Sequence, residues 1–368
     1  MREGTAQATR LDAGSATDAA LREAGGGRVA GVRLIEGLHR TMYAVQFVRG
    51  DWLCTASVNA VTGEVLSIVN DGDGAWDDPG PLDRPRAGDV LTLHLGQRTV
   101  WDLAAGADDP AVVHVATDAG VSTARVGRHG MYLLAEQHTG LGATRQLAAL
   151  PGGVAGITGD GWAFRLSAGR VVWRTRVPGV PYTVAAGPGR VLVATNAGAV
   201  ELDIVDGREV SRREVDGAAA RAAAYLPSGD RVLISHTGTV VVLPAGTGAP
   251  RWRCELGEYP ERLWVTDDRV YVAGVGGLKE IVPGEGVVCR WSTPLRDTVE
   301  SAVLAGGRVY TCAPGAHLAV HSYATAGYAG HLGGLPSAPE VIAPGWDPSG
   351  AALLLTGHRG GLISAHRC

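Results

Sequence analysis

The sequence has only 2 phenylalanines, and charged residues make up just 19% of its 368 positions. Acidic and basic residues are mixed throughout and leave a net charge of −4, which is not the electrostatic footprint of a nucleic-acid-binding protein. No apolar run of about 18 or more residues exists to span a membrane, and Met1–Ser15 lack the apolar core of a signal peptide. We therefore expect a cytoplasmic protein that binds neither nucleic acid nor membrane.

Motifs that would assign a catalytic or metal site are also lacking. The five cysteines are widely spaced, and none lies in a C-x-x-C pair: Cys54, Cys254, Cys289, Cys312 and Cys368. Their odd number favours reduced, mostly buried thiols over a disulfide framework or a zinc site. The sequence contains no G-x-S-x-G, H-E-x-x-H or G-x-x-x-x-G-K-[ST] motif. It therefore identifies no catalytic residue, predicts no metal and no cofactor, and leaves open whether the protein is an enzyme.

A repeat of about 40 residues fills the last two-thirds of the chain. A turn followed by Arg-Val and a short apolar run occurs four times, at Arg190, Arg231, Arg269 and Arg308. Tryptophans keep the same spacing at Trp173, Trp252 and Trp291. Several short strands per unit of this length are typical of a β-propeller, and the 54 glycines suit its many turns. The sequence thus predicts an all-β propeller over residues 89–368.

The two ends of this repeat region predict how the ring closes. Residues 340–343, 351–355 and 362–365 supply three strands of a last blade, and the chain then stops. Residues 89–95 alternate apolar and polar side chains just before the first blade. Because a closed ring leaves no exposed sheet edge, we expect this segment to supply the fourth strand, as a velcro closure. This arrangement gives seven blades; six or eight stay open because the first two blades have the weakest pattern.

A smaller α+β domain is expected at residues 16–70, after a disordered stretch at 1–15 and before a linker at 71–88. A short helix over Thr17–Glu23, capped by Ser15 or Thr17, precedes strand-like runs at 29–34, 42–48 and 52–58. Tyr43-Ala44-Val45-Gln46-Phe47 and Asn59-Ala60-Val61-Thr62-Gly63-Glu64-Val65-Leu66 resemble the motifs of the PepSY domain family. That resemblance implies proximity to peptides or peptidases. The alternative is an ordinary α+β cap in which Thr62-Gly63 is only a hairpin turn.

The repeats themselves resemble the quinoprotein (PQQ-like) propeller family. Gly161 to Ser167, then Gly169 and Trp173, follow its pattern G-x-x-x-x-L-x-x-G-x-x-x-W. The resemblance implies that Trp173, Trp252 and Trp291 dock against the neighbouring blade and have a structural role. A WD40-like repeat is the alternative, although its Gly-His and Trp-Asp pairs are missing apart from the isolated Trp101-Asp102. The calcium ligands and adjacent cysteines of quinone-dependent enzymes are not recognisable, so no cofactor is expected.

Propellers usually bind ligands at the mouth of their central channel, where the innermost strands begin. The candidate binding residues there are Tyr182, Arg221, Tyr225, Tyr259, Arg262, Glu300 and Trp346. Aromatic and arginine residues suit partner anchoring, although interblade packing accounts for them equally well. We expect a non-catalytic binding or scaffolding propeller whose partner is a peptide or protein. The alternatives are an enzyme, such as a lyase, hydrolase or biosynthetic catalyst, and a sensor of a small-molecule ligand.

Overall fold

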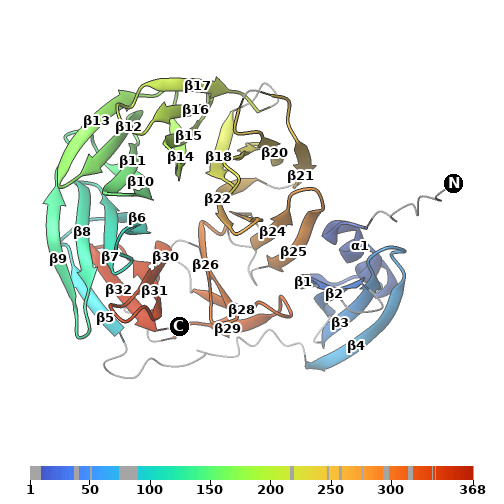
Figure 1. Cartoon of the computed structure of the whole chain (residues 1–368). Coiled ribbons are helices and arrows are strands. Elements are labelled where there is room, and N and C mark those ends of the chain that lie inside the picture. The colour runs from blue at the N-terminus through green and yellow to red at the C-terminus, as the bar shows by residue number, and fades with distance from the viewer. Residues whose placement is uncertain are drawn as a thin grey trace.

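The strands of the chain form a ring of small antiparallel sheets around a central axis (Figure 1). The computed structural model describes residues 10–36, 41–49, 52–73, 90–215, 219–246, 248–256, 259–275, 277–292, 298–313, 318–333, 335 and 337–367. Among these, no helix is long and apolar enough to cross a membrane. The architecture confirms the predicted all-β propeller.

Six four-stranded sheets of this ring are separate blades, each numbered from its inner to its outer strand. The first three contain β6 (Val100–Ala105), β7 (Val112–Thr117), β8 (Gly120–Val126) and β9 (Met131–Gln137); β10 (Thr144–Leu150), β11 (Gly153–Thr158), β12 (Trp162–Ser167) and β13 (Arg170–Arg176); and β14 (Pro181–Gly187), β15 (Arg190–Thr195), β16 (Gly198–Asp203) and β17 (Glu209–Arg213). The others contain β18 (Ala220–Tyr225), β19 (Arg231–Ser235), β20 (Thr239–Leu243) and β21 (Trp252–Glu255); β26 (Ser301–Ala305), β27 (Arg308–Cys312), β28 (Ala319–Ser322) and β29 (Tyr328–His331); and β30 (Val341–Trp346), β31 (Ala352–Gly357), β32 (Leu362–Arg367) and β5 (Val90–His94).

The remaining position in the ring is filled by half of a larger sheet. This half contains β22 (Pro260–Thr266), β23 (Arg269–Gly274), β24 (Gly277–Val282) and β25 (Gly286–Ser292). The same eight-stranded sheet continues into β1 (Arg28–Glu36), β2 (Thr41–Arg49), β3 (Trp52–Asn59) and β4 (Val65–Asp73). The expectation of seven separate blades is therefore corrected, since six are separate and the seventh four-stranded unit is fused to the N-terminal strands.

The predicted closure of the ring is confirmed. Strand β5 pairs antiparallel with β32, from Leu362 opposite His94 to His366 opposite Val90. The ring is thus closed by strands from two distant parts of the chain, and hydrogen bonding satisfies the edge that β32 would otherwise expose.

The N-terminal module, which we define as α1 (Ala13–Glu23) with β1–β4, packs directly onto the ring (Figure 1). Strand β1 pairs with β25 through Gly31, Val32 and Arg33. A single hydrophobic core contains Phe47 and Val58 of the module together with buried residues of β18–β25. This shared core fixes the module to two blades.

Three expected boundaries in this region need correction. Helix α1 begins at Ala13 with Asp12 as its N-cap, whose side chain accepts a bond from the Ser15 backbone N–H. Residues 10–15 of the expected disordered stretch are therefore placed, while 1–9 lie outside the described residues. Strand β4 ends at Asp73, within the expected linker, because Asp73 pairs with Trp52 across the sheet. Residues 74–88 lie outside the described part of the chain.

Two outer-strand tryptophans join their blade to the next one. Trp173 of β13 and Trp291 of β25 donate their indole N–H groups to the carbonyls of Ile204 and Ser322, at 2.9 and 3.3 Å. Both rings are buried, as expected for the residues that dock adjacent blades. Trp252 of β21, by contrast, is only partly buried, and its expected docking against the next blade stays a prediction.

Candidate functional site at the channel mouth

In five successive inner strands the pairing with the next strand is irregular near the first residue. The register shifts leave out Trp101, Arg145, Tyr182, Arg221 and Glu261, one residue in each of β6, β10, β14, β18 and β22. A residue left out of the pairing marks a β-bulge, which bends a strand and re-aims a side chain. Glu300 and Glu340 immediately precede β26 and β30, at the same place in their units. One position per unit therefore supplies a ring of seven side chains at the mouth.

On four of these strands the next residue links neighbouring units. Asp102, Gln146 and Thr183 accept hydrogen bonds from backbone N–H groups of the following inner strand, at 2.9, 2.6 and 3.1 Å. Ser301 accepts the equivalent bond from Ile342, at 3.0 Å. Because these bonds hold the inner strands in place, the bulged side chains of the mouth project from a rigid rim.

Arg221 is the centre of an aromatic cluster at this rim. Its guanidinium carbon lies 4.6 Å from the ring centre of Tyr182 and 5.4 Å from that of Tyr259. The same guanidinium forms an ion pair with Glu261 and donates a bond of 3.3 Å to the Pro260 carbonyl. Arg221 and Glu261 are mostly buried, so this pair is a fixed part of the rim.

His236 completes this cluster from the turn between β19 and β20. Its ring lies edge-on to Tyr182, with centres 5.0 Å apart, and Nδ1 is 3.1 Å from the hydroxyl oxygen of Tyr259. Burial and the nearby positive charge of Arg221 lower the pKa of His236, so the imidazole is neutral at physiological pH. A neutral ring between two tyrosines suits contact with uncharged or aromatic groups.

A second contact between an arginine and an aromatic ring lies at the bulges of β6 and β10. The guanidinium carbon of Arg145 lies 3.8 Å from the ring centre of Trp101. Both side chains are exposed, Trp101 to 39%. This is a cation–π contact that is open to an approaching partner.

The remaining three positions of the rim are acidic. Glu261, Glu300 and Glu340 belong to three consecutive units, and Glu340 forms an ion pair of 2.8 Å with Arg359. Glu300 faces solvent but is flanked by protein. Its partial burial raises its pKa most, and the nearby carboxylate of Glu261 raises it further. The mouth is therefore aromatic and cationic along β6–β18 and acidic along β22–β30.

Arg262 lies at the next position after Glu261, and its role is internal. It donates to the buried carboxylate of Asp102, with 2.5 Å between Nη2 and Oδ1. A guanidinium engaged in this way is not available as a free anchor for a partner.

Two of the predicted site residues lie away from the mouth. Tyr225 and Trp346 are the last residues of β18 and β30, at the opposite end of the inner strands from Arg221 and Glu340. The hydroxyl of Tyr225 donates a bond of 2.8 Å to Glu201 of the neighbouring blade, so this residue packs between blades. The structure thus gathers Tyr182, Arg221, Tyr259, Arg262 and Glu300 at one end and separates the other two from them.

Sequence reasoning missed several rim residues, namely Trp101, Arg145, His236, Glu261 and Glu340. The spacing of the inner strands could have identified four of them, because 101, 145, 182, 221, 261, 300 and 340 recur at 37 to 44 residues. His236 comes from a turn, and only the tertiary structure places it beside the tyrosines.

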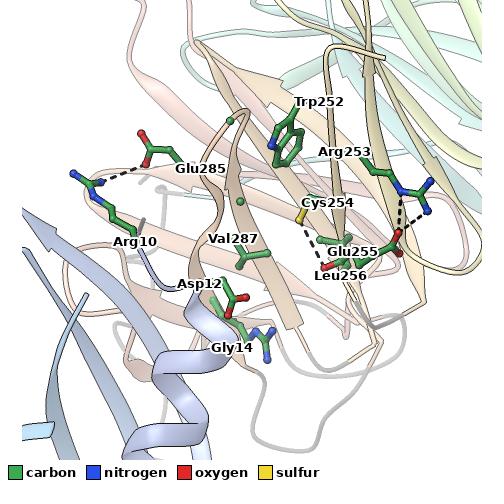
Figure 2. Close-up of a pocket in the computed structure, with 13 residues that line it drawn as sticks. Arg10, Asp12, Gly14, Trp252, Arg253, Cys254, Glu255, Leu256, Glu285 and Val287 are labelled. Carbon is green, nitrogen blue, oxygen red and sulfur yellow. Dashed lines mark hydrogen bonds and ion pairs between the residues drawn. The ribbon is translucent and has the colours of Figure 1, made fainter. Parts of the chain in front are cut away.

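A groove elsewhere on the molecule lies between β21, β25 with the turn before it, and the start of the module, with a volume of about 390 Å³ (Figure 2). It is lined by Trp252, Cys254 and Val287 and by charged residues of the module and the blades. Two of its arginines already pair with its carboxylates, Arg10 with Glu285 and Arg253 with Glu255. The rim of the channel therefore remains the stronger candidate for a binding site.

Within the described residues, no group of three or more histidine, cysteine, aspartate or glutamate side chains is arranged to hold a metal ion. Two deeply buried histidines instead contact hydroxyl groups within their own blades. His321 contacts Thr311 at 3.2 Å, and His366 contacts Ser364 at 2.9 Å. Burial lowers the pKa of His321 to about 3 and that of His366 to about 4, so both are neutral.

Comparison with known proteins supports the fold. No protein-family model matches the sequence, and no curated protein gives a significant match. Among solved structures, the β-propeller domain of Cps50 (Swd1) from Myceliophteria thermophila superposes with a TM-score of 0.66 at 13% sequence identity. The match covers 76% of this chain and 99% of that domain. At this identity the likeness shows the β-propeller fold alone, whereas the PepSY, quinoprotein and WD40-like resemblances remain predictions.

Proposed function

We propose that the protein is a non-catalytic binding propeller that captures a peptide segment of a partner protein on its channel mouth. The observation that carries this proposal is the cluster of Tyr182, His236 and Tyr259 around the fixed ion pair of Arg221 and Glu261. Aromatic residues on a rigid rim provide a large contact area with little loss of side-chain entropy on binding.

The geometry favours a partner that lies over the rim. Tyr259 is 40% exposed and Tyr182 is partly exposed, so both present ring surface to solvent. The hydroxyl of Tyr259 and the neutral imidazole of His236 add polar groups that can bond to a peptide backbone. The fold of the Swd1 propeller domain is consistent with such a role.

Selection from a phage-displayed library of random linear peptides tests the proposal. We expect the wild-type chain to enrich a related set of peptides whose synthetic forms bind in calorimetry. The double variant Tyr182→Ala/Tyr259→Ala should weaken binding by about 1000-fold, because truncating each hot-spot tyrosine costs about 2 kcal/mol and about 1.4 kcal/mol corresponds to tenfold.

Tyr132→Ala is the matched control, since Tyr132 is an exposed tyrosine of the outer strand β9, away from the mouth. It should leave peptide affinity unchanged. Failure of the wild type to enrich any peptide, or equal loss of binding in the control, would contradict the proposal.

A further inference from the structure

We infer that Trp101 and Arg145 form a subsite for a carboxylate, so that the captured segment carries an acidic residue at this point of the rim. The inference rests on the proposed function and names the partner chemistry at the same mouth. It concerns two residues on adjacent inner strands, β6 and β10, that the sequence analysis did not place among the binding candidates.

Arg145 differs from the other arginines of the mouth in what it contacts. Arg221 is paired with Glu261, and Arg262 with Asp102. Arg145 is exposed, and among the described residues it contacts the ring of Trp101 and forms no ion pair with a carboxylate. Its N–H donors therefore remain open to an incoming anion.

The contact with Trp101 prepares Arg145 for this role. A guanidinium over an indole ring is attracted to its face, and the contact limits the side chain to fewer rotamers. The N–H groups at the edge of the guanidinium can still bind a carboxylate through two parallel hydrogen bonds. Because both residues sit on bulges of locked strands, little ordering is required when the partner binds.

The charge distribution around the mouth fixes the direction of the segment. Glu300, which precedes β26 and forms no ion pair among the described residues, repels an acidic residue, while Arg145 on β10 attracts it. A carboxylate is therefore favoured beside β10 and disfavoured beside β26. This arrangement gives one orientation of the bound segment a lower free energy than its reverse.

The experiment repeats the peptide selection with wild type, Arg145→Gln and Arg170→Gln. Arg170 is the matched control, an exposed arginine at the turn between β12 and β13, on the opposite face of the ring. We expect aspartate or glutamate to be enriched at one position of the wild-type peptides, and this bias to vanish only with Arg145→Gln. In calorimetry, Arg145→Gln should lower the affinity for a selected peptide about tenfold or more, which is the range expected for losing a hydrogen bond to a charged group.

A charge swap makes the assignment specific. Arg145→Glu should bind a selected peptide poorly and recover affinity when the peptide's acidic residue is replaced by lysine. Peptides without acidic bias, or equal affinities for wild type and Arg145→Gln, would overturn this inference while Tyr182→Ala/Tyr259→Ala still tests the proposed function. If the wild type selects no peptide at all, the proposed function itself fails and the subsite fails with it.

Discussion

Arg262 and Asp102 join two inner strands that are not neighbours in the ring. Arg262 lies on β22 and Asp102 on β6, and β10, β14 and β18 lie between them on one side of the channel. Asp102 is 1% exposed and also accepts the backbone N–H of Leu147. A single carboxylate thus ties its own blade to the next one and to a strand across the channel.

Removing Arg262 should destabilise the ring. Arg262→Ala leaves the buried Asp102 charge without its cation, and we expect the free energy of unfolding to fall by about 3 kcal/mol in urea denaturation at pH 7. The double variant Arg262→Ala/Asp102→Asn should recover much of this loss, because asparagine is neutral and can still accept the bond from Leu147. Equal stabilities of the single and double variants would show that the unpaired charge is not the cause.

The outer-strand tryptophans should differ in their contribution to stability. Trp173→Ala and Trp291→Ala each remove a buried ring and an interblade hydrogen bond, and we expect a loss of about 3–5 kcal/mol. Trp252→Ala removes a partly buried ring that lines the groove, so we expect about 1 kcal/mol. Thermal and urea unfolding of the three variants measure the difference. A loss for Trp252→Ala as large as for Trp173→Ala would contradict this distinction.

The docking of the N-terminal module depends on Gly31. A side-chain carbon at this position would lie 1.9 Å from the carbonyl oxygen of Ala326, so Gly31→Ala must push β1 away from the ring. We expect faster amide hydrogen exchange in β1 and β25 and easier proteolysis of the module. Gly246→Ala is the control, since a side chain there meets open space. Unchanged exchange in Gly31→Ala would mean that the strand pairing with β25 tolerates the shift.

Acidification should destabilise the protein through its buried histidines. An unfolded histidine has a pKa of about 6.5, whereas the folded values for His321 and His366 are about 3 and about 4. Below about pH 6.5 the unfolded state therefore binds more protons than the folded state, and stability falls as the pH is lowered towards about 4. Each histidine contributes a slope of up to about 1.4 kcal/mol per pH unit.

Denaturation of wild type, His321→Gln and His366→Gln between pH 7 and pH 4.5 checks this expectation. Each variant should lose stability less steeply with falling pH than the wild type does. Parallel curves for all three proteins would assign the acid sensitivity to carboxylates instead.

The sequence by itself determined the repeat architecture and its closure. Short strands bounded by glycine turns can bury their apolar faces only against neighbouring repeats, so a period of about 40 residues specifies a ring of blades. The segment of alternating apolar and polar residues before the first blade could pair only with the exposed edge of the last blade, and β5 pairs with β32 as expected. The inner-strand origin of Tyr182, Arg221 and Arg262 followed from the same spacing.

Only the tertiary structure decided which of those residues face a partner. Arg221 and Arg262 pair with the carboxylates of Glu261 and Asp102, which are 40 and 160 residues away in the sequence. No local sequence pattern predicts such pairs. Arg145 stays open because its neighbour on the preceding inner strand is Trp101 and not an acidic residue. The fusion of the module to β25 was equally hidden, because strand pairing depends on which edges meet in space, while sequence periodicity records only which face of a strand is buried.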